Sequence, residues 1–338
     1  DFKEAIKNFD MSVGMAQTDA RPYMRRGQCF FELKHYNLAI KDFTQAMNYE
    51  SDSAAPYISR GIAYSKIGKH PEAIRDFEKA IHLNPSLGAA YSGLGDAYKN
   101  AGKNEEALGA YNQALKKNPK NVKALVGRGA IFKVLRKNKD ALKDYSYAIE
   151  LNPQYNTAYI HRGTAYSGMS RPEEALKDFD KALEIDPSNG ELLKRRGREY
   201  YKLKNAKEAL DDFSDALKQD LTNPDLYYLR AKSKKQLGKD GSAMEDLEYA
   251  IRLDPNQANF YLARAFLWHK EGKSILARED IKRAQFFDPA LPKNIEFAYD
   301  KKNPDRWKDE TFLQDENSKD GGEDTSESLH NTTSLGGD

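Results

Sequence analysis

The sequence predicts an all-α fold, a solenoid of stacked helical hairpins. A pattern of 34 residues recurs eight times in succession without insertion or deletion, with repeats that start at residues 20, 54, 88, 122, 156, 190, 224 and 258. Within each repeat, apolar side chains follow the 3.6-residue period of two amphipathic helices. A fixed period of this length is typical of repeat proteins, in which each unit buries its apolar face only against its neighbours.

The repeat at residues 156–189 illustrates the expected hairpin. One apolar stripe predicts a first helix and consists of Tyr159, Gly163 and Tyr166. A second stripe predicts the second helix and consists of Ala175, Phe179, Ala182 and Leu183. Ser170 and Glu173 have the spacing of a capping box at the start of the second helix, and Asp186-Pro187 predicts its end.

The order of aromatic, glycine, alanine and proline residues in this repeat resembles the tetratricopeptide repeat (TPR) family. Two alanines of the second helix occur in all eight repeats, at residues 39, 73, 107, 141, 175, 209, 243 and 277 and at residues 46, 80, 114, 148, 182, 216, 250 and 284. The resemblance covers residues 20–291. It implies a right-handed superhelical α-solenoid whose first helices line a concave groove, where an extended peptide or a helix of a partner protein binds.

The ends of the array depart from the repeat. Residues 1–13 match a second helix without its first, and we expect them to form the end of a truncated repeat, open to end-to-end contact with a partner. The seventh and eighth repeats drift, with alanine at the glycine position and an aliphatic residue at the buried aromatic position. Residues 292–303 are expected to form a capping helix. Residues 304–338 are expected to be a disordered acidic tail, in which positions 309–338 hold nine acidic residues and one lysine.

The sequence does not indicate catalysis, a cofactor, a metal site or nucleic-acid binding. No two of the six histidines have metal-ligand spacing, and Cys29 is the only cysteine, which excludes an internal disulfide. Two Gly-x-Gly pairs, beginning at Gly93 and Gly127, lack the third glycine of a dinucleotide fingerprint and fall inside predicted helices, where glycine serves helix contact. No apolar run is long enough to span a membrane. These features favour the cytoplasm, with the nucleus and the cilium as alternatives.

Two charged positions vary together between repeats. Counting places from the first residue of each repeat, place 7 is arginine and place 23 is aspartate in seven repeats, whereas the third repeat has Leu94 and Ala110. Because lone charges on apolar stripes are costly, we expect ion pairs within repeats. The expected pairs are Arg26–Asp42, Arg60–Asp76, Arg128–Asp144, Arg162–Asp178, Arg196–Asp212, Arg230–Asp246 and Arg264–Asp280.

Two surfaces are candidates for partner binding. An apolar set at places 5 and 9 is expected to line the groove and comprises Ile58, Ile62, Val126, Ala130 and Ile160. The alternative for this set is packing between adjacent first helices. A basic set on the sixth and seventh first helices comprises Lys194, Arg195, Arg198, Lys202, Lys232 and Lys235. We expect this basic set to attract the acidic tail; the alternative is a solvated face.

The resemblance implies a non-catalytic scaffold or adaptor that binds a short peptide or helix of a partner protein. Two alternatives stay open at the level of sequence. The chain could be the targeting or regulatory arm of a larger enzyme, or a structural strut in a cytoskeletal or ciliary assembly.

Overall fold

The computed structural model describes residues 2–15, 19–293 and 295, and within these ranges the chain forms seventeen α-helices. The helices are α1 Phe2–Met15, α2 Ala20–Glu32, α3 Tyr36–Tyr49, α4 Ala54–Lys66, α5 His70–Leu83, α6 Gly88–Asn100, α7 Asn104–Lys117, α8 Val122–Val134, α9 Asn138–Leu151, α10 Asn156–Gly168, α11 Pro172–Ile185, α12 Gly190–Lys202, α13 Ala206–Gln219, α14 Pro224–Gln236, α15 Asp240–Leu253, α16 Ala258–Lys270 and α17 Ser274–Phe287. The all-α fold predicted from the sequence is confirmed.

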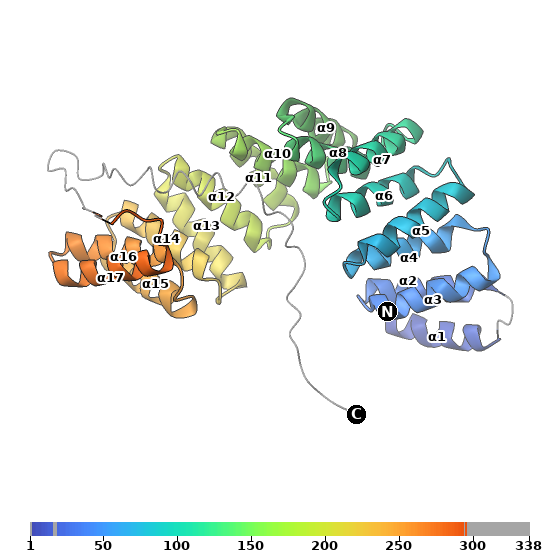
Figure 1. Ribbon diagram of the computed structural model, residues 1–338, viewed down its shortest axis with the longest axis horizontal. Helices are drawn as coiled ribbons and strands as arrows, with labels where there is room; N and C mark the ends of the chain where they lie inside the picture. Colours follow the sequence, from blue (N-terminus) through green and yellow to red (C-terminus); the bar gives the residue numbers. More distant parts are fainter. Residues whose placement is uncertain (1, 16–18, 294, 296–338) are drawn as a thin grey trace. The chain divides into compact units, whose positions relative to one another are not determined.

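The helices are organised into two compact units, residues 1–158 and residues 159–338, each of which is described by itself. In the first unit, hairpins α2–α3, α4–α5, α6–α7 and α8–α9 follow one another, and α1 packs against α2 (Figure 1). In the second unit, hairpins α12–α13, α14–α15 and α16–α17 follow the hairpin of α10 and α11. Each second helix also packs against the next first helix within its unit, so the apolar core runs along the stack.

An aromatic ring from the second helix fills the centre of six hairpins. These fully buried rings belong to Phe43, Phe77, Tyr111, Tyr145, Phe179 and Phe213. Each ring lies against the glycine at place 8 of its own first helix, where an added Cβ would come within 2.5–3.1 Å of a ring atom. In the last two hairpins the ring is replaced by Leu247 or Ile281, and the glycine by Ala231 or Ala265. The departures predicted for these repeats are therefore paired substitutions, in which a smaller side chain on the second helix accompanies a larger one on the first.

The turn inside each hairpin has a left-handed residue at place 15. In all eight repeats its φ is positive, at Lys34, Gly68, Gly102, Arg136, Ser170, Lys204, Gly238 and Gly272. The N–H of Ser170 donates to the carbonyl of Ser167, and the N–H of Arg171 donates to Tyr166, which closes the end of α10. The capping box predicted from Ser170 is therefore wrong. Ser170 has φ 56°, and the N-cap of α11 is Arg171, without a side-chain cap bond.

The variant Arg136→Gly is expected to raise the free energy of unfolding by about 1 kcal/mol, because glycine enters the left-handed region without the strain that Cβ causes. The matched control is Gly102→Ala, at the same place of the preceding hairpin, where φ is +74° and the surroundings are open. This control should lose a similar amount. Urea denaturation of both variants measures the difference, and an unchanged or lower midpoint for Arg136→Gly would contradict the assignment.

The two ends predicted from the sequence are only partly covered by the structure. Residues 2–15 form α1, where Ala5, Ile6 and Phe9 are half-buried and Met11 is exposed. The end-to-end contact proposed for this helix stays a prediction. The capping helix predicted for residues 292–303 falls almost entirely outside the described residues, and the acidic tail at residues 304–338 lies wholly outside them.

Candidate functional site

The arginine and aspartate that recur in seven of the repeats are paired within each hairpin. In each of the seven hairpins, the arginine Nε and Nη2 donate to the two carboxylate oxygens of the aspartate in the same repeat, at 2.6–2.9 Å. The aspartate side chains are nearly buried, and the arginines keep about a fifth of their surface exposed. Burial raises the pKa of Asp178, although the Arg162 guanidinium acts in the opposite direction. These pairs join the two helices of a hairpin and offer no charge to a ligand.

The third repeat replaces its ion pair with apolar contacts. Leu94 and Ala110 are 8% and 7% exposed and belong to one cluster with Ala73, Phe77 and Ala97. Two side chains that carry charge in the other hairpins thus become part of the core. The third repeat therefore shows that the hairpin can form with two apolar residues in place of the arginine and the aspartate.

A polar cluster that the sequence analysis missed lies beside these apolar contacts. The buried Tyr111 hydroxyl donates to Asp96 Oδ1 at 2.6 Å, and Lys123 Nζ lies 3.0 Å from Asp96 Oδ2. Burial raises the pKa of the Tyr111 hydroxyl, and Asp96 raises the pKa of the Lys123 ammonium. The sequence signal for this cluster was Tyr111 itself, which has a hydroxyl group at the place where four other repeats have phenylalanine. Asp96 occupies place 9 of α6, between the hairpins that carry Ile62 and Ala130 at the same place.

The apolar groove set does not form one open patch. In the first unit, Ile58 and Ile62 are half-buried and pack against the cluster that contains Leu94 of α6, and Ala130 is also half-buried. Val126 is only 5% exposed. Val126 is therefore nearly buried and adds no exposed apolar surface, and its assignment to the groove stays a prediction. Ile160 is half-buried and belongs to the second unit.

The basic set lies on α12 and α14 of the second unit. Lys194 and Arg195 form ion pairs with Glu191, at 2.7 and 3.3 Å, and Lys202 Nζ lies 2.7 Å from Glu199. α12 has five cationic and two acidic residues, and α14 has four and one. Their hairpin partners α13 and α15 are acidic, with four carboxylates each against two cations and one. Without the internally paired Arg196, Arg230, Asp212 and Asp246, the two first helices keep seven cations against three carboxylates. The two second helices keep six carboxylates against three cations, so charge is segregated by sign between first and second helices of these hairpins.

Aromatic rings interleave with these cations, which the sequence analysis did not predict. Lys232 Nζ lies 4.9 Å from the ring centroid of Tyr201 and 5.4 Å from that of Tyr228. Lys235 Nζ lies 3.6 Å from the Phe266 ring centroid. Such contacts hold the lysine side chains along the rings, because the face of an aromatic ring attracts a cation. The surface formed by α12 and α14 therefore carries lysine side chains whose positions are restricted by contact with aromatic rings.

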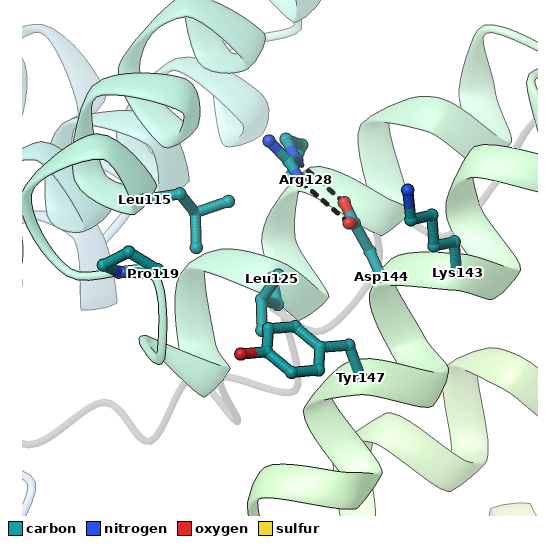
Figure 2. A pocket seen from close by; sticks show the side chains of 7 residues that line it. All are labelled: Leu115, Pro119, Leu125, Arg128, Lys143, Asp144 and Tyr147. Atoms are coloured by element: carbon teal, nitrogen blue, oxygen red, sulfur yellow. Dashed lines mark hydrogen bonds and ion pairs between the residues drawn. The ribbon is translucent and has the colours of Figure 1, made fainter.

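A small depression lies on α7, α8 and α9 of the first unit (Figure 2). It has a volume of about 240 Å³, and Leu115, Pro119, Leu125, Lys143 and Tyr147 line it together with the Arg128–Asp144 pair. Its volume is below the range of typical small-molecule sites, and the two charges in its wall already bond each other.

No cluster of three or more His, Cys, Asp or Glu side chains that could hold a metal ion occurs within residues 2–15, 19–293 and 295. Cys29 is buried, and burial raises the pKa of its thiol. In the same described part of the chain, no helix combines the length and apolar composition needed to cross a membrane.

Comparison with known families decides the identity of the fold. Family models described as tetratricopeptide repeat match residues 20–53, 58–122, 92–156, 157–189 and 224–257, which together cover more than half of the chain. The chain is a tetratricopeptide repeat protein. TPR proteins mediate protein–protein interactions and are usually non-catalytic. No curated protein matches this TPR sequence.

Solved structures agree on the TPR fold. The Cut9–Hcn1 hetero-tetramer of the APC/C contains a chain similar at a TM-score of 0.60 and 18% identity, over 84% of this chain and 52% of that one. PilF of Pseudomonas aeruginosa is similar at a TM-score of 0.56 and 19% sequence identity, and the match covers 61% of this chain and 94% of PilF. A TPR protein from Parabacteroides merdae is similar at a TM-score of 0.51 and 25% sequence identity, and the match covers 71% of this chain and 94% of that protein. This TPR chain thus spans about half the length of the first of these.

Proposed function

We propose that this TPR protein is a non-catalytic scaffold that binds partner proteins on the first-helix faces of its hairpins, with different chemistry in its two units. The segregation of charge between first and second helices of α12–α15 is the observation that supports this most directly. A surface with an excess of one charge favours partners that carry the opposite charge. The family's general role in protein interaction supports the same proposal.

The first unit supplies the apolar part of the proposed surface. Ile62 and Ala130 are half-buried at place 9 of α4 and α8, and the carboxylate of Asp96 stands at place 9 of the helix between them. Tyr111 and Lys123 fix this carboxylate. A partner segment with one apolar and one hydrogen-bond-donating side chain fits such an arrangement. Burial of the apolar side chain would contribute roughly 1.5–3 kcal/mol.

The variant Ile62→Asp is expected to abolish capture of partners through the first unit, because it places a charge in the apolar contact. Affinity purification with quantitative mass spectrometry, from the native lysate, compares the variant with the wild type. Lys79→Asp, an exposed change on the second helix of the same hairpin, is the matched control and should capture normally. Because Ile62 also packs against the cluster that contains Leu94, some loss of melting temperature is expected, and capture is compared well below the melting temperature of the variant. Normal capture by Ile62→Asp, or unfolding of the variant, would reject the apolar surface.

The second unit supplies a basic surface, for which we infer an acidic partner segment. Lys232 and Lys235 lie along aromatic rings, which keeps their ammonium groups in place. The chain's own residues 309–338, with nine acidic residues and one lysine, have the complementary charge. A tethered segment acts at roughly millimolar effective concentration and would compete with an external acidic partner.

Removal of residues 309–338 is therefore expected to tighten binding of an acidic peptide several-fold at low salt. The effect should fade near physiological ionic strength, where the screening length is about 8 Å. Fluorescence anisotropy with a labelled Asp/Glu-rich peptide measures it. Lys232→Glu combined with Lys235→Glu should abolish peptide binding, whereas Lys218→Glu on α13 should not. Equal affinities with and without residues 309–338 would argue against competition by this segment.

A further inference from the structure

The last described helix exposes two large apolar side chains at places where the other repeats have polar residues, proline or glycine. Ile275 and Phe286 of α17 are 76% and 78% exposed. At the place of Ile275, the other repeats have Asn37, Pro71, Glu105, Lys139, Glu173, Lys207 and Gly241. At the place of Phe286, they have Asn48, His82, Lys116, Glu150, Glu184, Lys218 and Arg252. Large exposed apolar side chains at two such places indicate an interaction surface.

The face of α17 that corresponds to hairpin stacking has changed in the opposite sense. In the second hairpin, Ile74 and Ile81 at places 21 and 28 pack against the cluster that includes Leu94 of the next first helix. Both places are apolar in the first seven repeats, but α17 has Arg278 and Gln285 there. Gln285 Nε2 donates to the carbonyl oxygens of Pro292 and Lys293, at 2.6 and 3.2 Å. Thus α17 has polar residues at the two places where other second helices pack against the next hairpin, and apolar residues at two places that are exposed.

The new face is complementary to itself. Ile275, Glu279, Lys282 and Phe286 are spaced i, i+4, i+7 and i+11, so they form one stripe along the exposed side of the helix. The stripe is symmetric about its centre in position, apolar at both ends and oppositely charged in the middle. If two copies of α17 lie antiparallel about a two-fold axis, Ile275 of each copy meets Phe286 of the other. Glu279 of each copy then meets Lys282 of the other.

We propose that the occupant of this face is a second copy of the chain, in an isologous α17–α17 contact. The symmetry of a two-fold interface requires a self-complementary patch, and both the apolar and the charged pairs of this stripe meet that requirement. The patch is small, with three large apolar side chains when Leu276 is included. An interface of this size gives a weak, reversible dimer rather than an obligate one.

Charge reversal tests the register of the contact. Glu279→Lys alone and Lys282→Glu alone should each be monomeric, because two like-charged pairs would then meet across the axis. An equimolar mixture of the two variants should associate as the wild type does, because both charged pairs become attractive again. Sedimentation velocity of the full chain, from about 10 μM to about 1 mM, measures the association over the range expected of a weak interface. We expect each single variant to stay monomeric over this range, which corresponds to association weakened about tenfold or more.

Glu245→Lys is the matched control, since Glu245 occupies the place of Glu279 on α15 and is also exposed. It should associate like the wild type, and Phe286→Asp should not associate at all. A monomeric wild type over the whole range would overturn the proposal, and would leave the face to another partner or to the chain's own later residues. Failure of the variant mixture to associate, with an associating wild type, would also overturn it.

Discussion

Asp178→Ala is expected to lower the free energy of unfolding by about 3 kcal/mol, more than the double variant Asp178→Ala with Arg162→Leu. The single change removes the two carboxylate oxygens that accept from Arg162 Nε and Nη2, and the side chain of Arg162 is only about a fifth exposed. Breaking one side of a buried pair costs roughly 3–5 kcal/mol, and the remaining exposure of Arg162 places the expectation at the lower end. The double change reproduces Leu94 and Ala110, which the third hairpin holds in an apolar cluster.

The sign of the Asp178 pKa shift supports the milder loss for the double variant. Burial raises the pKa of the carboxyl above its ordinary value, with Arg162 acting against this effect. A raised pKa in the folded state means that the contribution of Asp178 to stability is present at low pH and is lost as pH rises through the folded pKa. The pKa of Arg162 is raised in turn by its hydrogen bonds to Asp178, so the two partners' shifts act in opposite directions on stability at neutral pH. Urea denaturation of both variants at pH 7 provides the test, and equal losses would contradict the argument.

The hairpins could be predicted from the sequence because their cause is local and repeated. A 34-residue period with apolar stripes fixes each helix, and the joint loss of charge at Leu94 and Ala110 indicated which arginine belongs with which aspartate. Pairing across neighbouring repeats would have left Asp76 of the second repeat opposite Leu94, and Arg128 of the fourth repeat opposite Ala110. Repetition thus supplied, inside one chain, the comparison that a single sequence usually lacks.

The remaining features depend on distances between helices, which a periodic pattern does not contain. Place 5 can face the groove or a neighbouring first helix, and Val126 is buried while Ile58 is half-buried. Ser170 has the residue type of a helix N-cap, but the turn needs a left-handed residue one position earlier than the cap. The Tyr111–Asp96 bond joins residues of two helices and depends on a single hydroxyl group.

Gly197→Ala is expected to lower the free energy of unfolding by about 2 kcal/mol, although alanine is the better helix former. An added Cβ would lie 2.7 Å from Phe213 Cε1 and 3.0 Å from two further ring atoms. The ring is fully buried, so it cannot move aside without disturbing its neighbours. Overpacking of this kind costs about 1–3 kcal/mol, and the gain of up to about 1 kcal/mol in helix propensity offsets only part of it.

Gly109→Ala is the matched control, because Gly109 is also in a helix but an added Cβ there would meet no atom within 4 Å. The control should gain up to about 1 kcal/mol from propensity alone. Adding Phe213→Leu to Gly197→Ala should recover most of the loss, since Ala231 with Leu247 already forms this combination in the next hairpin. Phe213→Leu alone should be destabilising, because it leaves a cavity beside the glycine. Thermal and urea denaturation of the four variants complete the cycle, and additive effects of the two core changes would show that ring and glycine are not coupled.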